Sequence, residues 1–410
     1  MNKKIYMTAG YNTISLGSGR KEFHPAKPRP GLEHYITEAG KATLVQIGGA
    51  QNVDESVIGN FMASRFNKQG HLAGFIPMID PDLAGKSATR VEAACASGGV
   101  ALTTAFRSIL AGTSDTVLAV GVEVQNTVKA IYGADVLAGA GWFQHRKKGH
   151  AYFFPGQFSN RAGAYFERFG RDETRKGLAR WYRNAIENAR LCPTAQEYHN
   201  TTANLEVVAM TPPNGKVFVD NLNIFDCSKV SDGASCIAVM SEDGLKRSGI
   251  ALKDAVEVIS FAQVQRDITK LPDDLTILAA TQLAVRKALA NAGITIDQLA
   301  TIELHDCFSI AGILTVEAIG LAPHGKGAEW IASGHSARDG KLPINTTGGL
   351  VGWGHPTGAT GVHQAVTVWE QLTGHAGEAQ IMVNKGKKHA LSINMGGDDV
   401  TVVAIVYKKN

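Results

Sequence analysis

Short apolar runs alternate with longer amphipathic stretches along most of the chain. The apolar runs have the length and the Val, Ile and Leu content of buried strands, and they cover residues 53–61, 115–124, 236–242, 299–307, 390–397 and 400–408. The amphipathic stretches repeat their apolar positions at helical spacing over residues 99–112, 275–293 and 361–374. Strands that alternate with helices predict an α/β fold with a mainly parallel sheet.

The middle of the chain, at residues 126–215, has a different pattern. It carries few strand signals, and it holds 6 of the 15 Phe residues and the basic run Arg146-Lys147-Lys148. Residues 174–190 predict a helix with Thr174 as its N-cap. We interpret this region as an insertion between two α/β parts. It is either a cap that contacts substrate or a solvated helix with a local aromatic core.

Two short segments of the chain are similar to each other. Cys95-Ala96-Ser97-Gly98 and His355-Pro356-Thr357-Gly358 both precede a predicted helix, and a predicted strand follows each helix. Duplication of one βα unit would produce this repeat, although a four-residue match also arises by chance. In duplicated halves the two helix N-termini occupy equivalent places about a pseudo-twofold axis, and Cys95 faces His355.

Composition narrows the class of protein. A chain of 410 residues with a net charge of +4 has room for two domains or one large layered unit, and it lacks the concentrated Lys and Arg of nucleic-acid-binding proteins. No apolar run is long enough to span a bilayer, and the first residues lack the apolar segment of a secretory signal. The five cysteines lack disulfide spacing, which indicates free thiols in a reducing compartment. We therefore expect a cytoplasmic protein with no nucleic-acid partner and no membrane span.

The two repeated segments contain a cysteine and a histidine that suggest nucleophilic chemistry. Cys95 begins a helix of small residues, and a helix N-terminus lowers the pKa of a thiol. His355 lies in the glycine-rich segment 348–361, where Pro356 suits the first helical position and the imidazole is free to deprotonate a thiol. The residues alone leave two plainer interpretations open: a buried structural cysteine and an incidental histidine in a glycine-rich turn.

Two further segments place polar groups after predicted strands. Asn394-Met395-Gly396 ends a strand, and its glycine N–H either faces a developing oxyanion or belongs to a tight turn. Residues 304–310 hold His305 and Cys307, which are open to interpretation as a metal-ligand pair, a redox thiol or an ordinary buried cysteine. No second pair of ligands has matching spacing, so we expect no metal.

Taken in order along the chain, these segments resemble the thiolase family. The resemblance rests on the Cys95 segment, on VSDGA at residues 230–234, on GHPTGATG around His355 and on the glycine loop near the C-terminus. Within that family, HDCF at residues 305–308 is similar to the sterol-carrier-protein type thiolases. AYFERFG, CPTAQ and FDCSKVSDGA in the middle of the chain are similar to the same branch.

The resemblance implies a thiolase-like five-layered αβαβα sandwich of two duplicated halves with an inserted loop domain. The N-terminal half would comprise residues 1–250, with the loop domain at about 126–215, and the C-terminal half residues 251–410. It also implies a homodimer or homotetramer. Coenzyme A and acyl-CoA would be substrates, with no tightly bound cofactor.

The implied activity is that of a CoA-dependent C-acyltransferase in lipid metabolism, such as fatty acid β-oxidation. It would cleave 3-ketoacyl-CoA with CoA, or condense acyl-CoA with acetyl-CoA, through an acyl-enzyme on Cys95 after His355 takes the thiol proton. Ordinary members use a second cysteine as acid/base. Asn394 stands at that position here, and an amide cannot exchange a proton at neutral pH. The resemblance therefore implies Cys307 in that role.

The resemblance also implies two sites that stabilise oxyanions. His355, with a water positioned by His305, would hold the enolate oxygen. The backbone N–H groups of Cys95 and Gly396 would hold the tetrahedral intermediate.

Several other polar residues receive weaker assignments. No catalytic role is predicted for Asp306, and His363 is interpreted as a packed or solvated histidine. Cys192, Cys227 and Cys236 are interpreted as structural. The phosphates of CoA require positively charged partners. The alternative is that these basic residues form a solvated surface. The candidates are Arg146, Lys147, Lys148, Arg175, Lys176 and Arg183.

Three alternative functions stay open at this point. A ketoacyl- or hydroxymethylglutaryl-synthase-like condensing enzyme would share the nucleophile but lack the HDCF cysteine. A non-catalytic thiolase-like scaffold would bind acyl-CoA or a partner protein. A cysteine hydrolase would use Cys95 and His355 but gives no reason for Cys307.

Overall fold

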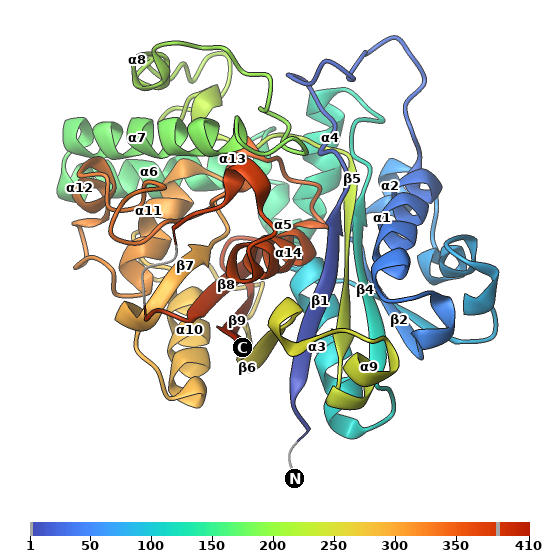
Figure 1. Cartoon of the computed structure of the whole chain (residues 1–410). Helices are drawn as coiled ribbons and strands as arrows, with labels where there is room; N and C mark the ends of the chain where they lie inside the picture. Colours follow the sequence, from blue (N-terminus) through green and yellow to red (C-terminus); the bar gives the residue numbers. More distant parts are fainter. Residues whose placement is uncertain (1–2, 383–385) are drawn as a thin grey trace.

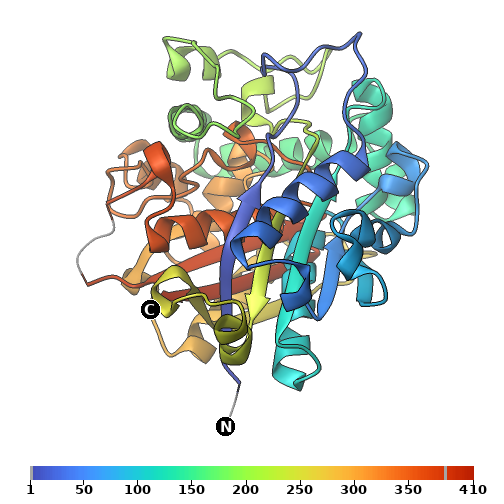
Figure 2. The ribbon, with the colours of Figure 1, turned by 45° about the vertical axis from the view of Figure 1, so that its right-hand side comes forward.

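Nine strands hydrogen-bond in the continuous order β3-β2-β4-β5-β1-β6-β9-β8-β7 in the computed structural model, which describes residues 3–382 and 386–410. The sheet folds into two layers that meet where β1 pairs with β6, as Figure 1 and Figure 2 show. The strands are β1 (Ile5–Asn12), β2 (Glu55–Gly59), β3 (Ser87–Val91), β4 (Thr116–Glu123), β5 (Gly233–Met240), β6 (Val256–Gln265), β7 (Leu299–Glu303), β8 (His389–Gly396) and β9 (Thr401–Lys409).

Helices fill the space around and between the two sheet layers (Figure 1). α3 (Ser97–Ala111) and α14 (Thr360–Thr373) lie between the layers, where their apolar side chains share one core with both sheets. α1 (Leu32–Gln46) packs on the outer face of the first layer, and α10 (Ala279–Ala292) and α11 (Ser309–Ala318) pack on that of the second. The predicted five-layered αβαβα sandwich is therefore confirmed.

The remaining helices are peripheral to these layers. Between β4 and β5 lie α4 (Ala130–Leu137), α5 (Phe143–Arg146), α6 (Phe153–Phe169), α7 (Arg171–Ala189) and α8 (Leu205–Ala209). Elsewhere the structure has α2 (Ala63–Phe66), α9 (Glu242–Arg247), α12 (Gly327–Ala332) and α13 (Gly349–Gly352). Short 3₁₀ segments lie at Ala50–Asn52, Leu72–Met78, Pro81–Leu83, Ala138–Ala140, Ile224–Asp226, Leu252–Asp254, Ile296–Gln298 and Gly377–Ala379.

The prediction of a mainly parallel sheet is wrong. β2 runs parallel to β3 and β4, and β7 runs parallel to β8, but the other five pairings are antiparallel. Helices cover both faces of each layer. Because both faces are covered, the antiparallel strands of this sheet carry the continuous apolar runs that are otherwise typical of parallel strands.

The two sheet layers repeat one arrangement. The orders β2-β4-β5-β1 and β7-β8-β9-β6 both consist of one parallel pair followed by two antiparallel pairs. α3 precedes β4 and α14 precedes β8, so the segments of Cys95 and His355 occupy equivalent places. The two central helices meet at glycine, since a Cβ on Gly98 would lie 2.8 Å from Gly361 N. The domain boundaries themselves stay predictions.

The helix predicted at 174–190 is longer at its N-terminal end than expected. α7 begins at Arg171, so Thr174 lies inside the helix, and its hydroxyl donates to Gly170 O at 2.6 Å. Asp172 and Glu173 in the first turn suit the positive end of the helix dipole and favour this earlier start. Trp181 of α7 is buried in the same core as α11, so this is not a solvated surface helix.

One helical stretch in the described part of the chain, residues 94–111, has the length and hydropathy to cross a membrane, contrary to the expectation that no run is long enough. It contains α3. Leu102, Phe106 and Ile109 of this helix are fully buried between the two sheet layers. A central core helix accounts for this composition.

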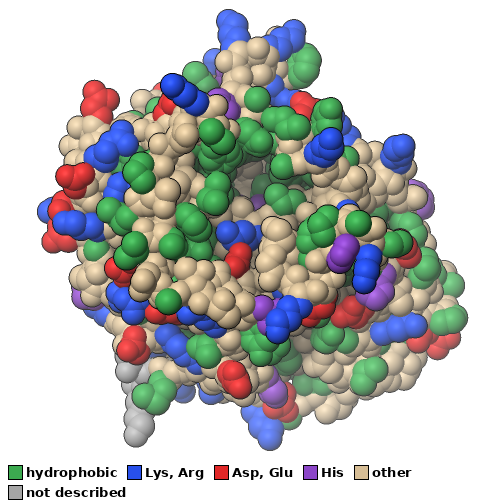
Figure 3. Space-filling model, turned by 90° about the horizontal axis from the view of Figure 1, so that it is seen from above, with side chains coloured by type: hydrophobic (Ala, Val, Ile, Leu, Met, Phe, Trp, Pro, Cys, Tyr) green, Lys and Arg blue, Asp and Glu red, His purple; other side chains and the backbone are tan. Residues whose placement is uncertain are grey.

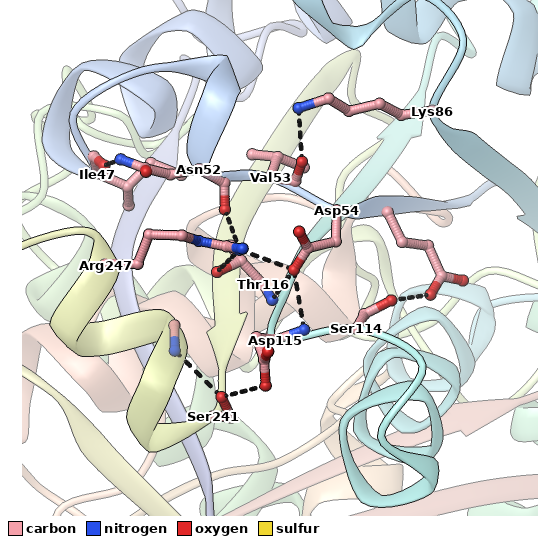
Figure 4. A network of polar contacts seen from close by, with 12 residues as sticks. Ile47, Asn52, Val53, Asp54, Lys86, Ser114, Asp115, Thr116, Ser241 and Arg247 are labelled. Atoms are coloured by element: carbon pink, nitrogen blue, oxygen red, sulfur yellow. Dashed lines mark hydrogen bonds and ion pairs between the residues drawn. The ribbon is translucent and has the colours of Figure 1, made fainter.

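A polar network joins the starts of β2 and β4 (Figure 4). Asp54 precedes β2 and accepts hydrogen bonds from the backbone N–H groups of Asp115 and Thr116, both at 2.9 Å. Arg247 of α9 donates to the same carboxylate at 2.7 Å. The network therefore connects the starts of β2 and β4 to α9.

Candidate active site

One pocket of about 440 Å³ collects the four residues that the sequence predicts as catalytic. Cys95 and His355 reach it from the segments before α3 and α14, and His305 and Cys307 reach it from the loop between β7 and α11. The duplicated fold thus brings two helix starts and one strand end to a common space. Open α/β sheets place ligands at such strand ends.

Apolar side chains form most of the pocket wall. Ala134 and Leu137 come from α4, and Phe154 and Phe158 come from α6. Seen from above in Figure 3, this part of the molecule is hollowed, and hydrophobic side chains gather around the opening. The inserted region therefore lines the pocket, which favours its interpretation as a cap. A dry wall strengthens the electrostatic interactions inside.

A tight turn presents Cys95 to the pocket. Ala94 has φ of +54°, a left-handed conformation that costs an alanine about 1–2 kcal/mol. Ser97 stabilises it, because its Oγ accepts a hydrogen bond from Ala93 N at 3.0 Å and donates to Ala94 O at 2.6 Å. This turn sets the direction of the chain between β3 and α3, and so the position of Cys95.

The thiol of Cys95 is neutral at rest. Burial raises its pKa to about 12, the charges of Glu123 and Glu92 act in the same direction, and the N–H groups of Gly397 and Cys95 act against them. Backbone N–H groups lower this pKa in the predicted direction, but lost hydration and nearby carboxylates outweigh them, so the net shift is upward. A thiol with so high a pKa becomes a nucleophile only if a base takes its proton.

His355 is an uncharged base beside this thiol. One ligand atom each of Cys95, His305 and His355 lies within 4.8 Å of the others. The backbone of His355 is fixed on both sides, by donation to Ser231 Oγ at 2.9 Å and by a hydrogen bond from Gln125 Nε2 to its carbonyl at 2.7 Å. Burial lowers the pKa of His355 to about 3, so its imidazole can accept a proton.

The helix that follows His355 begins later than expected. α14 starts at Thr360, so Pro356 lies in the preceding turn and not at the first helical position. The carbonyl of Pro356 accepts hydrogen bonds from the backbone N–H groups of Ala359 and Thr360, at 2.8 and 3.1 Å. The turn leaves His355 outside the helix, where its side chain can line the pocket.

His305 lies against His355 and is also uncharged. The two ring centroids are 5.1 Å apart, and the ring planes are nearly perpendicular. Burial, with a smaller effect of His355, lowers the pKa of His305 well below its ordinary value. Nδ1 of His305 lies 3.3 Å from Asn394 Nδ2. Two neutral imidazoles therefore share one end of the pocket with the thiol of Cys95.

Cys307 is a second neutral thiol in the same pocket. Burial raises its pKa well above the ordinary value, and the charges of Cys95 and Asp306 act in the same direction. Its carbonyl accepts a hydrogen bond from Ser228 N at 2.9 Å. A protonated thiol beside the reacting atoms suits proton donation.

Asp306 anchors the loop between β7 and α11 from behind. Its carboxylate accepts hydrogen bonds from Leu350 N at 2.7 Å and Trp181 Nε1 at 2.9 Å, and it does not line the pocket. Burial raises the pKa of Asp306 to about 7. These contacts connect His305 and Cys307 to α7 and α13, which is a positional role.

Gly396 and Gly397 both lie near Cys95. A Cβ on Gly396 would meet Ala96 N at 3.1 Å, and the predicted role of the Gly396 N–H stays a prediction. Gly396 is the last residue of β8 and does not line the pocket, whereas Gly397 does. The backbone N–H of Gly397, together with that of Cys95, stabilises the charged form of the thiol. Gly397 has φ of +67°, a left-handed conformation that glycine adopts without strain and that follows the end of β8.

Sequence reasoning missed Glu123, the last residue of β4. Its fully buried carboxylate accepts hydrogen bonds from Phe61 N at 2.9 Å, Met62 N at 3.0 Å, Thr357 Oγ1 at 2.9 Å and Gly358 N at 3.1 Å. It therefore ties the segment after β2 to the segment of His355. The available signal was an acidic residue inside an apolar strand, because a buried carboxylate requires partners.

Two of the predicted phosphate contacts line a second cavity of about 600 Å³. Lys147 and Lys148 border it together with Gln157 and Asn160, whereas Phe154 and Phe158 of the same helix face the first pocket. The two cavities thus lie on different faces of α6. The lysine side chains would have to extend around α6 to contact a ligand in the first pocket.

The other predicted phosphate contacts carry carboxylate partners. Arg175 is buried against Asp226 at 2.7 Å, so the prediction for it is wrong: it is a structural residue. None of these four residues lines either cavity. The other three residues pair as follows: Arg146 with Asp135 at 2.8 Å, Lys176 with Glu173 at 2.6 Å, and Arg183 with Glu187 at 2.8 Å and with Glu206 at 3.3 Å.

Two of the cysteines interpreted as structural, and His363, lie away from the pocket. Cys192 and Cys236 are buried. Cys227 lines the pocket, and its sulfur lies 3.5 Å from Asn223 O. His363 stacks on Trp353 with ring centroids 3.5 Å apart, so of the two interpretations the packed histidine is correct.

Comparisons with known proteins concern the family and the fold of the chain. A family model described as thiolase C-terminal domain-like matches residues 262–409, and one described as β-ketoacyl synthase, N-terminal domain, matches residues 35–142. An acetyl-CoA acetyltransferase of Methanothermobacter thermautotrophicus is 34% identical over 381 residues, which cover 91% of this chain and 94% of the relative.

Two further likenesses concern the branch and the fold. Sterol carrier protein 2 of Homo sapiens is 30% identical over 332 residues, which cover 76% of this chain and 56% of that protein. A crystal structure of human mitochondrial 3-ketoacyl-CoA thiolase has a TM-score of 0.71 at 16% identity and covers 100% of this chain and 99% of its own. At that identity the structural likeness concerns the fold alone.

Proposed function

Because the chain belongs to the thiolase family, it is an enzyme of acyl transfer from CoA thioesters, and we propose that it works through an acyl-enzyme on Cys95. The observation that carries the proposal is the shared pocket: two thiols and two uncharged imidazoles line it together. A single cysteine with one histidine would serve a hydrolase. The second thiol supplies the acid that cleavage between two carbon atoms requires.

The first half of the reaction forms the acyl-enzyme. His355 takes the proton of Cys95, and Sγ attacks the 3-keto carbonyl of a 3-ketoacyl-CoA. The bond between C2 and C3 breaks, and Cys307 gives its proton to C2. Acetyl-CoA leaves, the acyl group stays on Cys95, Cys307 is a thiolate, and His355 is an imidazolium that holds the proton from Cys95.

The second half returns every group to its starting state. The thiolate of Cys307 takes the proton of CoA, and the CoA sulfur attacks the acyl-enzyme. Acyl-CoA forms, and Cys95 leaves as a thiolate that recovers the proton held by His355. The reverse sequence is the condensation of acyl-CoA with acetyl-CoA, so one set of residues serves both directions.

Two groups of donors are placed to stabilise the charges that develop. The backbone N–H groups of Cys95 and Gly397 would hold the oxygen of the tetrahedral intermediate on Sγ. His305 and His355 would hold the enolate oxygen of the acetyl-CoA part. Removing one such donor typically slows an enzyme about 10²–10³-fold.

A condensing-enzyme function is the alternative that a specific observation favours, namely the match of residues 35–142 to the β-ketoacyl synthase model. That match covers the nucleophile segment and stops before His305 and Cys307. Cys307 lines the pocket. A condensing enzyme would not need it, so the second thiol favours the thiolase reaction.

Mass spectrometry of the protein after incubation with acetyl-CoA tests the nucleophile. Cys95→Ala should carry no acetyl group, because the covalent route is lost. Cys227→Ala is the matched control, since Cys227 lines the same pocket and has no role in the proposed steps. Acetylation of Cys95→Ala would show that another residue is the nucleophile.

A further inference from the structure

The two pocket histidines have different hydrogen-bond partners. The partner of each ring determines which of its two nitrogens carries the proton. A neutral imidazole donates from one ring nitrogen and accepts at the other. Nδ1 of His305 contacts the amide of Asn394, and Nδ1 of His355 contacts the hydroxyl of Thr360 at 2.7 Å. In each residue Nε2 is the nitrogen left for the pocket.

Asn394 has a defined orientation. Its Oδ1 accepts a hydrogen bond from Gly99 N at 3.0 Å, and a backbone N–H can only donate. Its Nδ2 is therefore on the opposite side, where it donates to Cys95 O at 3.0 Å and points its second hydrogen at His305 Nδ1. Nδ1 of His305 must then be the acceptor.

Thr360 has the reverse effect on His355. Its hydroxyl lies 3.2 Å from Pro356 O and donates to it, as threonine hydroxyls in the first turn of a helix commonly do. With its proton engaged there, Oγ1 accepts from Nδ1–H of His355. The lone pair of Nε2 then faces the pocket, where the thiol proton of Cys95 must go.

We infer that Asn394 is a positioning residue that holds His305 as its Nε2–H tautomer, so that His305 donates to the substrate oxygen while His355 is held as the opposite tautomer and accepts. The asparagine that replaces the second cysteine of ordinary family members thus has a definite task. The donating role of His305 toward substrate rests on the proposed function. The tautomer itself does not.

Nuclear magnetic resonance of the unaltered protein with ¹⁵N-labelled histidine rings tests the tautomer directly. His305 is assigned by the signal that disappears in His305→Asn. The expected result is a protonated Nε2 and an unprotonated Nδ1 in His305, and the reverse in His355. A protonated Nδ1 in His305 would overturn the inference without any assay of activity.

Two variants then separate positioning from simple support. Asn394→Ala removes the donor, so the fixed tautomer of His305 should be lost while that of His355 is kept. Thr360→Val should do the opposite. An unchanged His305 signal in Asn394→Ala would contradict the inference even if that variant were less stable.

Kinetics provide a further readout that a purely structural role would not give. Asn394→Ala should slow cleavage of acetoacetyl-CoA about 10²-fold, the usual effect of losing an oxyanion donor, while self-acetylation of Cys95 by acetyl-CoA changes much less. Equal losses in both reactions would mean that Asn394 only supports the start of α3. Lack of cleavage by the unaltered protein would contradict the proposed function and leave the tautomer result intact.

Discussion

Asp54 lies where β2 begins and Glu123 lies where β4 ends, so these two carboxylates mark opposite ends of neighbouring parallel strands. Both accept backbone N–H groups. Asp54 is partly exposed and accepts a hydrogen bond from the guanidinium of Arg247 at 2.7 Å. Figure 4 draws this contact. Glu123 is fully buried, and none of the ion pairs among the described residues includes it.

The two ends respond to their surroundings in opposite ways. Burial works against the charge of Asp54, but Arg247 and two backbone N–H groups outweigh it and lower the pKa. For Glu123, burial outweighs the hydrogen bonds that its carboxylate accepts and raises the pKa. The end that carries the pocket thus holds its acids and bases in a dry environment that favours neutral forms. At the other end, the charged pair of Asp54 and Arg247 stabilises the structure.

The largest effect is expected at the pocket end, from Glu123→Ala. It leaves Phe61 N, Met62 N, Thr357 Oγ1 and Gly358 N without an acceptor inside the protein. An unsatisfied buried donor costs about 1–3 kcal/mol, so the free energy of unfolding should fall by at least about 3 kcal/mol, and acyl transfer should be lost. Urea denaturation and the acetoacetyl-CoA assay measure both effects.

Glu123→Gln is the control for that variant. It keeps an acceptor oxygen and removes only the charge, which the surroundings already disfavour. It should therefore retain much more stability than Glu123→Ala. Equal losses in the two variants would show that the pocket end depends on the charge of Glu123, and the contrast with Asp54 would disappear.

A smaller effect is expected at the supporting end, from Asp54→Asn. This partly exposed carboxylate should contribute about 1 kcal/mol at neutral pH. Because its folded pKa is lowered, the contribution is fully present above the ordinary value of 3.8 and is lost as the pH falls through the lower folded pKa. Urea denaturation of parent and variant at about pH 7 and about pH 3.5 should show the difference shrink on acidification.

Glu123 should show the reverse dependence, which sharpens the comparison. Its folded pKa is raised, so the folded state takes up a proton before the unfolded state as the pH falls. The stability of the parent relative to Glu123→Gln should therefore rise on acidification. If both carboxylates gave the same sign, the proposed difference between the two ends of the strands would be wrong.

The strands that the sequence predicted correctly are those with long apolar runs. Residues 115–124 and 400–408 coincide closely with β4 and β9. β1, β3 and β6 were missed, because their polar residues interrupt the apolar run. Strand direction was also missed, since helices on both faces give antiparallel strands the composition of parallel ones.

The candidate site was predictable as a set of residue types and not as an electrostatic environment. The motifs placed Cys95 and His355 at equivalent helix starts, and the fold brings both to one pocket. The net rise in the pKa of Cys95 was not predicted, because nothing in the local sequence shows the burial of the thiol or its closeness to Glu123. Gly397, next to the predicted Gly396, also lines the pocket, which the strand pattern alone did not indicate.

The role of Cys307 is the central claim, and a comparison of Cys307→Ala with Cys227→Ala tests it most directly. Both cysteines line the pocket, and only Cys307 belongs to the proposed proton transfers. With matched stability, Cys307→Ala should still be acetylated on Cys95 but should lose CoA-dependent cleavage of acetoacetyl-CoA, by about 10²–10⁴-fold. Cys227→Ala should keep both activities. Normal turnover by Cys307→Ala would contradict the account and require another acid in the pocket.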